Sequence, residues 1–137
     1  MSWADSLIKL SGYEVEVLQK RLAEIADRRQ AVDMRIAMLE AEAEHEAQRA
    51  REDAQNGWYQ VGFLEGVRIR RAALQYEAEQ IMMEEAGARD ALAQAFEEQK
   101  KYEQVADNMR IARDKVVARM EIAAMDELGL RRAAAGR

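Results

Sequence analysis

The chain has 137 residues, of which 34% are charged and 6% aromatic, with a net charge of −5 and neither proline nor cysteine. Without cysteine there is no disulfide scaffold and no thiolate chemistry, and one histidine cannot supply a two-histidine metal site or a serine–histidine hydrolase. No glycine-rich phosphate loop is present, and the acidic balance does not indicate nucleic-acid binding. We therefore expect no catalysis, no metal and no cofactor. The 26 alanines and the many other helix formers favour long helices with narrow contact seams.

The N-terminal segment has no basic start followed by an apolar signal core. No stretch approaches the ~20 apolar residues that span a bilayer. We expect a cytoplasmic protein that does not insert into the membrane by itself.

The first helix is predicted from about residue 3 to residue 56. Ser2 and Asp5 stand three residues apart, in the pattern of a capping box that starts a helix. Apolar residues then recur every seven positions on two interleaved repeats, as in a coiled coil. The repeats contain Ile8, Val15, Leu22, Ile36, Ala43 and Ala50, with Arg29 as a polar break, and Ser11, Leu18, Ile25, Val32 and Leu39.

A turn is predicted over about residues 57–62, because Gly57, Gly62 and Gly66 lie close together and follow Asn56. The second helix is predicted over about residues 63–128, with a frayed tail over residues 129–137 that starts at Gly129. One of its seven-residue repeats is apolar throughout, and the companion repeat is interrupted by Arg71, Glu85, Gln99 and Arg113. The apolar repeat contains Val67, Leu74, Ile81, Ala88, Ala95, Tyr102, Met109, Val116, Ala123 and Leu130.

Two long helices and one short turn predict an all-α fold, an antiparallel two-helix coiled-coil hairpin that forms a single domain over residues 1–137. Near the turn, Ala43, Ala47, Ala50 and Ala54 supply the contacts of the first helix. Because alanine buries little apolar area, we expect this part of the hairpin to be the more flexible one.

The second helix is predicted to extend beyond the first. Folding the chain about residues 57–60 places Ile8 opposite residues 107–112 and leaves about fifteen residues uncovered, or ~23 Å of helix. This segment carries many apolar residues, which would be covered by a partner, by self-association or by folding back within the monomer, and we favour a partner. The candidate binding residues at this end are Leu7, Tyr13, Arg113, Lys115, Val117, Arg119, Met120, Ile122, Met125 and Leu128.

Charge also varies along the chain. Residues 110–137 carry seven basic and four acidic side chains, a net charge of +3. The middle of each helix is acidic, and such a run is usually a solvated face, as we also expect for His45. Alternatively, like charges at the same height on both helices keep the hairpin soluble. The acidic residues are Glu40, Glu42, Glu44 and Glu46 on the first helix and Glu77, Glu79, Glu84 and Glu85 on the second.

Aromatic and aliphatic side chains gather beside the predicted turn. They either cap the hairpin core or form a second binding surface, because tryptophan and phenylalanine are scarce elsewhere in the chain. The candidate residues are Trp58, Tyr59, Phe63, Leu64 and Val67.

Several stretches of this chain match a known family pattern. They are Leu18, Gln19, Arg21 and Leu22, followed by Arg28 and Arg29; Phe63 and Leu64; Glu98, Gln99, Lys100, Lys101, Tyr102 and Glu103; and Met125, Asp126, Glu127 and Leu128. With these residues, its length and its two-arm layout, the chain resembles the flagellar type III export FliJ family and its injectisome relatives over nearly its whole length.

The resemblance implies an antiparallel coiled coil similar to the central stalk subunit of rotary ATPases. It implies that the end with both termini enters the ring of the export ATPase hexamer, that the arms near the turn contact a membrane export-gate protein, and that export chaperones bind. Phe63 matches an aromatic residue that family members use toward the gate, and Val67 replaces an aliphatic residue there. The chain departs from some relatives, which have tyrosines in the region of Glu42, His45 and Arg49.

We therefore predict a non-enzymatic component of the bacterial flagellar export apparatus, located in the cytoplasm and peripherally at the inner membrane at the flagellar basal body. Arg113, Lys115 and Arg119 would meet acidic loops of the ring, and the opposite end would engage the gate. A general coiled-coil scaffold and a holdase chaperone, which would use alanine and methionine surfaces, are the alternatives.

Overall fold

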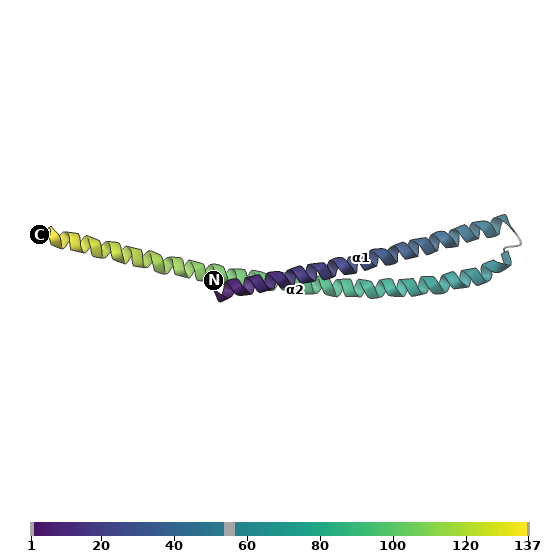
Figure 1. The fold of residues 1–137 in the computed structure, drawn as a ribbon, viewed down its shortest axis with the longest axis horizontal. Coiled ribbons are helices and arrows are strands. Elements are labelled where there is room, and N and C mark those ends of the chain that lie inside the picture. The colour runs from purple at the N-terminus through teal and green to yellow at the C-terminus, as the bar shows by residue number, and fades with distance from the viewer. Residues whose placement is uncertain (1, 54–56, 137) are drawn as a thin grey trace. The chain divides into compact units, whose positions relative to one another are not determined.

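The structure, a computed structural model, describes residues 2–53 and 57–136, and of Gly57 and Trp58 only the backbone. Helix α1 (Trp3–Glu52) and helix α2 (Gly57–Ala135) lie side by side as a hairpin, and α2 continues beyond the part that α1 covers (Figure 1). The predicted all-α helical hairpin is therefore confirmed. Neither helix, over these residues, is long and apolar enough to cross a membrane.

The start of α1 is also as predicted. The backbone N–H of Asp5 donates a hydrogen bond to Oγ of Ser2 at 3.2 Å, and the backbone N–H of Ser2 donates to Oδ2 of Asp5 at 3.1 Å. These reciprocal bonds form a capping box, which satisfies amide donors that the first turn of a helix leaves unpaired.

Helix α2 is longer at both ends than predicted. The turn expected over residues 57–62 is wrong, because this segment is the first part of α2. Glycine costs a helix about 1 kcal/mol but does not forbid it, and none of the glycines in the described ranges has a positive φ. The frayed tail expected over residues 129–137 is wrong as far as Ala135, because mostly arginine and alanine, both strong helix formers, follow Gly129.

The end of α1 also differs from the prediction. The helix was expected to reach residue 56 and ends at Glu52, and residues 54–56 lie outside the described part.

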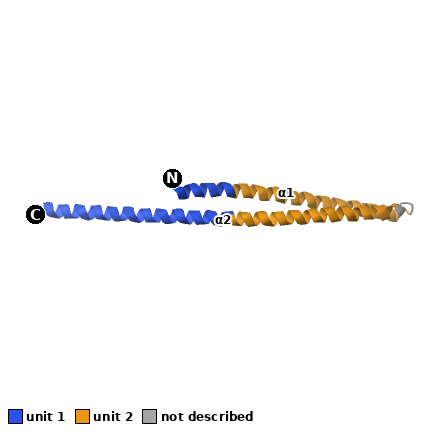
Figure 2. Ribbon diagram, turned by 90° about the horizontal axis from the view of Figure 1, so that it is seen from below, with its two compact units in different colours: residues 1–14, 95–137 blue, residues 15–94 orange. Residues whose placement is uncertain are grey.

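Contacts divide the chain into two units, coloured in Figure 2: unit 1 comprises residues 1–14 and 95–137, and unit 2 comprises residues 15–94. The single domain over residues 1–137 stays a prediction. In unit 2 the core is the cluster of Ile25, Val32, Ile81 and Ala88. In unit 1 the buried residues are Ala4, Ser11 and Ala95, and a Cβ built at Gly12 would lie 3.6 Å from Nε2 of Gln99.

The predicted seven-residue repeats mark the buried face of both helices. Every predicted seam residue of α1 is buried or half-buried apart from the polar Arg29, and the same holds for the apolar repeat of α2 from Val67 to Met109. Beyond Met109 the repeat continues in the sequence, but Val116, Ala123 and Leu130 are exposed. The apolar repeat of α2 therefore continues beyond the part of α2 that α1 covers.

Ion pairs between the helices of unit 2 show that they are antiparallel. As the number of the α1 residue rises from Arg28 to Glu42, the number of its α2 partner falls from Glu84 to Arg70. The expectation of like charges at the same height is wrong, because acidic residues on each helix face arginines on the other. The pairs are Arg28–Glu84 at 3.1 Å, Arg29–Glu85 at 2.9 Å, Arg35–Glu77 at 2.7 Å, Arg70–Glu42 at 3.6 Å and the pair Arg71–Glu40.

Candidate functional site

The terminal overhang, which we define as residues 110–135 of α2 in unit 1, exposes many large apolar side chains. Every residue from Arg110 to Ala135 is exposed. At 1.5 Å per residue the segment spans about 39 Å, more than the ~23 Å predicted. There are two reasons. Helix α2 continues to Ala135 instead of ending near residue 128, and the register is shifted, since Gly12 faces Gln99 and Ile8 therefore lies opposite about residue 103 rather than 107–112.

The candidate residues of the terminal overhang are all exposed. Met120, Ile122 and Met125 are 66%, 60% and 71% exposed. Arg113, Lys115, Val117, Arg119 and Leu128 are exposed as well. The structure gives no fold-back of this segment, because α2 is one helix to Ala135.

On α1 the candidates at this end differ from each other. Tyr13 is exposed together with Trp3 and Leu10, whereas Leu7 is half-buried. Trp3 and Leu10 are seven residues apart and therefore lie on one face of α1, away from the buried Ala4 and Ser11. This second apolar face is what a helix needs if it packs against a neighbour on each side.

A groove begins where α1 stops covering α2. It is lined by Met109, Ala112, Arg113, Val116 and Val117, which have the spacing of one helix face. The charge of Arg113 reaches the start of α1, where it helps to lower the pKa of Asp5. The main cause of that lowered pKa is the hydrogen bond from the backbone N–H of Ser2.

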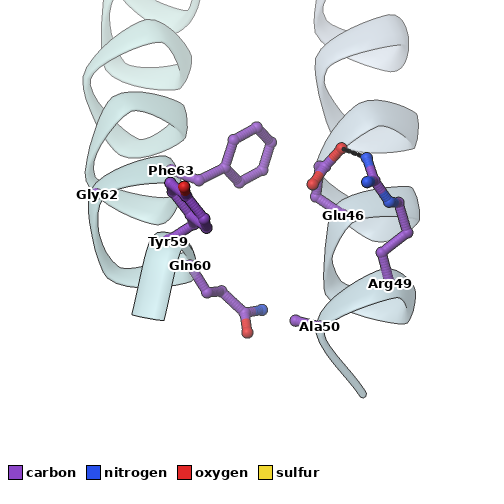
Figure 3. Close-up of a pocket in the computed structure, with 7 residues that line it drawn as sticks. All are labelled: Glu46, Arg49, Ala50, Tyr59, Gln60, Gly62 and Phe63. Carbon is purple, nitrogen blue, oxygen red and sulfur yellow. Dashed lines mark hydrogen bonds and ion pairs between the residues drawn. The ribbon is translucent and has the colours of Figure 1, made fainter. Parts of the chain in front are cut away.

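At the tip of unit 2, a cavity of about 580 Å³ separates the end of α1 from the start of α2. Figure 3 shows Phe63 pointing from α2 toward α1, while Glu46 and Arg49 form an ion pair of 3.1 Å on the opposite wall. Ala50, Gln60 and Gly62 are too small or too polar to fill the space between them. The seam of the hairpin is consequently loosely packed at its tip.

The candidate tip residues do not form one exposed surface. Tyr59 and Leu64 are exposed, and Phe63 is half-buried at the cavity wall. Val67 is only 2% exposed, so it packs in the seam and is not available to a partner of the closed hairpin. The side chain of Trp58 lies outside the described residues.

The sequence analysis did not name Glu46, Arg49 or Gln60 as candidate site residues. Extending the two seam repeats by one heptad would have found two of them, because Glu46 follows Leu39 by seven residues and Gln60 precedes Val67 by seven. A polar residue at a seam position of both helices indicates a gap in the core. His45 is exposed, as expected, and residues 2–53 and 57–136 contain no group of histidine and carboxylate side chains that could hold a metal ion.

Comparisons with known proteins identify the family of the chain. No family model matches it, and no solved structure matches it. Two curated relatives, the flagellar FliJ proteins of Caulobacter vibrioides strains NA1000/CB15N and ATCC 19089/CB 15, are each 54% identical over 134 residues. The alignments cover 98% of this chain and 96% of each relative. The chain therefore belongs to the flagellar FliJ family.

Proposed function

We propose that the protein is a non-enzymatic, stalk-like component of the bacterial flagellar type III export apparatus. Its terminal overhang binds the ring of the export ATPase, its tip binds a membrane export-gate protein, and it assists the delivery of substrates and export chaperones. It acts in the cytoplasm and peripherally at the inner membrane at the flagellar basal body, and it uses no cofactor. Membership of the flagellar FliJ family supports this assignment.

The observation that carries the proposal is the exposure of apolar side chains along the terminal overhang. Large apolar side chains exposed on a lone helix are unfavourable in water, and burying one such side chain lowers the free energy by about 1.5–3 kcal/mol. The exposed large apolar residues here are Ile111, Val116, Val117, Met120, Ile122, Met125, Leu128 and Leu130. A pore lined by apolar side chains and acidic loops would cover them and would meet Arg113, Lys115 and Arg119.

The tip supports a second contact. Tyr59, which lines the cavity, and Leu64 are exposed, and aromatic side chains are frequent anchors of protein interfaces. The cavity walls combine Phe63 with the Glu46–Arg49 ion pair, so the site offers an apolar surface and both charges to a gate protein.

The test replaces Met120, Ile122 and Met125 together with serine. Because these side chains are exposed, the fold should persist while the apolar contact with the ring is lost. We expect the variant to lose the stimulation of the cognate export ATPase that the wild-type protein gives, measured as steady-state phosphate release. Circular dichroism should show an unchanged helix content.

A matched control replaces Met34, Met38 and Met83 of unit 2 with serine, because their side chains are equally exposed. This control should stimulate the ATPase as the wild-type protein does. Full stimulation by the overhang variant, with its helices intact, would overturn the ATPase contact.

A holdase chaperone is the second candidate, favoured by the exposure of Met34, Met38, Met82 and Met83 on the outer faces of unit 2. Methionine side chains adapt to many apolar shapes and suit promiscuous binding. In this case the unit 2 control would lose the suppression of client aggregation, measured by light scattering, while the overhang variant would keep it.

A further inference from the structure

The companion repeat of α2, which shares the seam with the apolar repeat, becomes polar at every second position. Its polar members follow each other at intervals of fourteen residues, and they are Arg71, Glu85, Gln99, Arg113 and Glu127. A polar residue in a coiled-coil seam stabilises little by itself, but it selects the partner and the register that satisfy it.

In unit 2, α1 satisfies both polar positions with an opposite charge. Nη2 of Arg71 donates to Oε2 of Glu40 at 2.9 Å. Glu85 is only 5% exposed, and its Oε2 lies 2.9 Å from Nε of Arg29 in an ion pair whose N–H is not aligned for a hydrogen bond. Arg71 of α2 is therefore paired with an acid on the facing helix, and Glu85 is paired with a base on the facing helix as well as with Arg89 of its own helix at 2.6 Å.

In unit 1 the next polar position meets a small residue instead. Gln99 lies against Gly12, where even an added Cβ would make ordinary van der Waals contact at 3.6 Å. The neutral amide fits beside backbone and needs no opposite charge. All three polar positions that α1 covers are thus matched by what α1 places opposite them.

The terminal overhang repeats the order found in unit 2. Arg113 is followed after fourteen residues by Glu127, as Arg71 is followed by Glu85. Between them the seam positions are Val116, Met120 and Ala123, all exposed, and the groove at Arg113 opens where α1 ends. Glu127 contacts only its own helix, in the ion pair with Arg131 at 2.9 Å, among the interactions of the described residues.

We propose that the seam of the terminal overhang binds one amphipathic helix of a partner protein. This helix runs antiparallel to α2 and continues the coiled coil beyond the N-terminus of α1. It places an acidic residue against Arg113 and a basic residue against Glu127. Two observations choose this occupant: the seam is continuous with the interface between α1 and α2, and its charges repeat the order that α1 already satisfies. The inference rests on the proposed function, since both place a partner on the overhang. It adds the secondary structure of the partner segment and the charges that this segment places against α2.

The structure supplies a probe for such a helix. Residues 22–43 of α1 carry Arg29 and Glu40, the two charges that satisfy Glu85 and Arg71. A fluorescently labelled synthetic peptide of this sequence should bind the full-length protein in trans, measured by fluorescence anisotropy. Reversing the charge at the overhang, Arg113→Glu, should weaken the binding about tenfold, and a peptide with Glu40→Arg should restore it.

The matched control is Arg132→Glu, which makes the same change of net charge at an exposed position of the overhang outside the seam. It should leave the affinity of the peptide unchanged within about twofold, since screened charges off the contact contribute little.

Four outcomes would overturn the inference. The first is the absence of binding up to about 100 µM peptide. The second is equal weakening by Arg132→Glu, which would indicate a diffuse charge effect. The third is weakening by Arg71→Glu instead of Arg113→Glu, because the peptide would then be displacing α1 from unit 2. The fourth is self-association of the protein in sedimentation velocity that Arg113→Glu abolishes, because the occupant would then be a second copy.

This inference and the proposed function fail in different ways. If the peptide does not bind while the wild-type protein still stimulates the export ATPase, only the helix-binding mode is lost. If stimulation itself does not depend on Met120, Ile122 and Met125, the ATPase contact is lost whatever the peptide does.

Discussion

Two regions of α2 share one seven-residue repeat and differ in what covers it. Val67 is 2% exposed against α1, whereas Val116, seven heptads later in the same repeat, is 53% exposed. A similar contrast separates Glu85, which is buried and faces Arg29, from Glu127, which is exposed on the companion repeat. The two regions therefore have the same pattern and different energetics.

The difference shows that a heptad pattern encodes a seam but not its occupant. In the covered region the pattern stabilises the hairpin, because removing an aliphatic side chain from water gains about 1.5–3 kcal/mol. In the overhang, the apolar residues at the equivalent heptad positions contribute almost nothing to the stability of the isolated chain. Their apolar character can be used only when another molecule supplies the second helix or a pore wall.

The largest expected effect comes from removing a core side chain in the covered region. Ile81 is part of the cluster with Ile25, Val32 and Ala88. Ile81→Ala should lower the free energy of unfolding by about 2–4 kcal/mol, because it removes buried methylene groups and leaves a cavity. Urea denaturation followed by circular dichroism measures this change.

The matched substitution in the overhang is Ile122→Ala, at a position 60% exposed. It should change the free energy of unfolding by about 0.5 kcal/mol or less. An equal loss in both variants would mean that the overhang is packed in the isolated protein, and the contrast between the two regions would be gone.

A smaller effect is expected at the polar seam positions. Glu85→Ala leaves Arg29 and Arg89, which lie 2.9 and 2.6 Å from its carboxylate oxygens, without their partner. Because Arg29 is half exposed, we expect a loss of about 1–2 kcal/mol rather than the 3–5 kcal/mol of a fully buried pair.

The counterpart is Glu127→Ala, which removes only an exposed ion pair within the helix and should cost about 0.5 kcal/mol or less. Both variants are compared by thermal melting. An increase in stability for Glu85→Ala would show that burying the Glu85 carboxylate costs more free energy than its ion pairs recover. The only role of Glu85 would then be to select the register of the two helices.

Most of the fold could be predicted from the sequence, because the seven-residue repeats mark the residues that become buried. The repeats from Ile8 to Ala50 and from Val67 to Met109 predict which faces are buried, and the Ser2–Asp5 spacing predicts the start of α1. The ends of α2 could not be predicted from propensity, because a glycine costs only about 1 kcal/mol and neighbouring contacts or helix formers offset it. The error of a few residues at the turn then shifted the expected partner of Ile8.

The candidate surfaces were partly predictable. The overhang follows from the unequal lengths of the two helices, and its exposed residues were named correctly. Val67 was named both as a member of the apolar repeat and as a tip candidate, and the repeat was the better guide, because Val67 is only 2% exposed. The ion pairs between the helices were also missed, since Arg28 and Glu84 meet only once the antiparallel register is known.

The smallest expected effect is the acid sensitivity of the covered region. A hydrogen bond from Arg71 holds the pKa of Glu40 below its ordinary value of 4.5, and one from Arg28 does the same for Glu84. A carboxyl whose pKa is lowered in the folded state contributes stability that is full above the unfolded value and is lost as the pH falls through the folded value. The melting temperature of the protein should therefore fall as the pH drops below about 4.5.

Glu40→Gln tests how much of this acid sensitivity belongs to the ion pairs across the helices. The variant should melt slightly lower than the wild-type protein at pH 7 and show a smaller further decrease on acidification, because one linked carboxyl has been removed. If wild type and variant lose the same number of degrees between neutral and acidic pH, the Arg71–Glu40 pair does not stabilise the hairpin. The charges of the covered seam would then only select the register of the two helices. The inference for Arg113 and Glu127 needs no more than this, because it concerns their choice of partner and not stability.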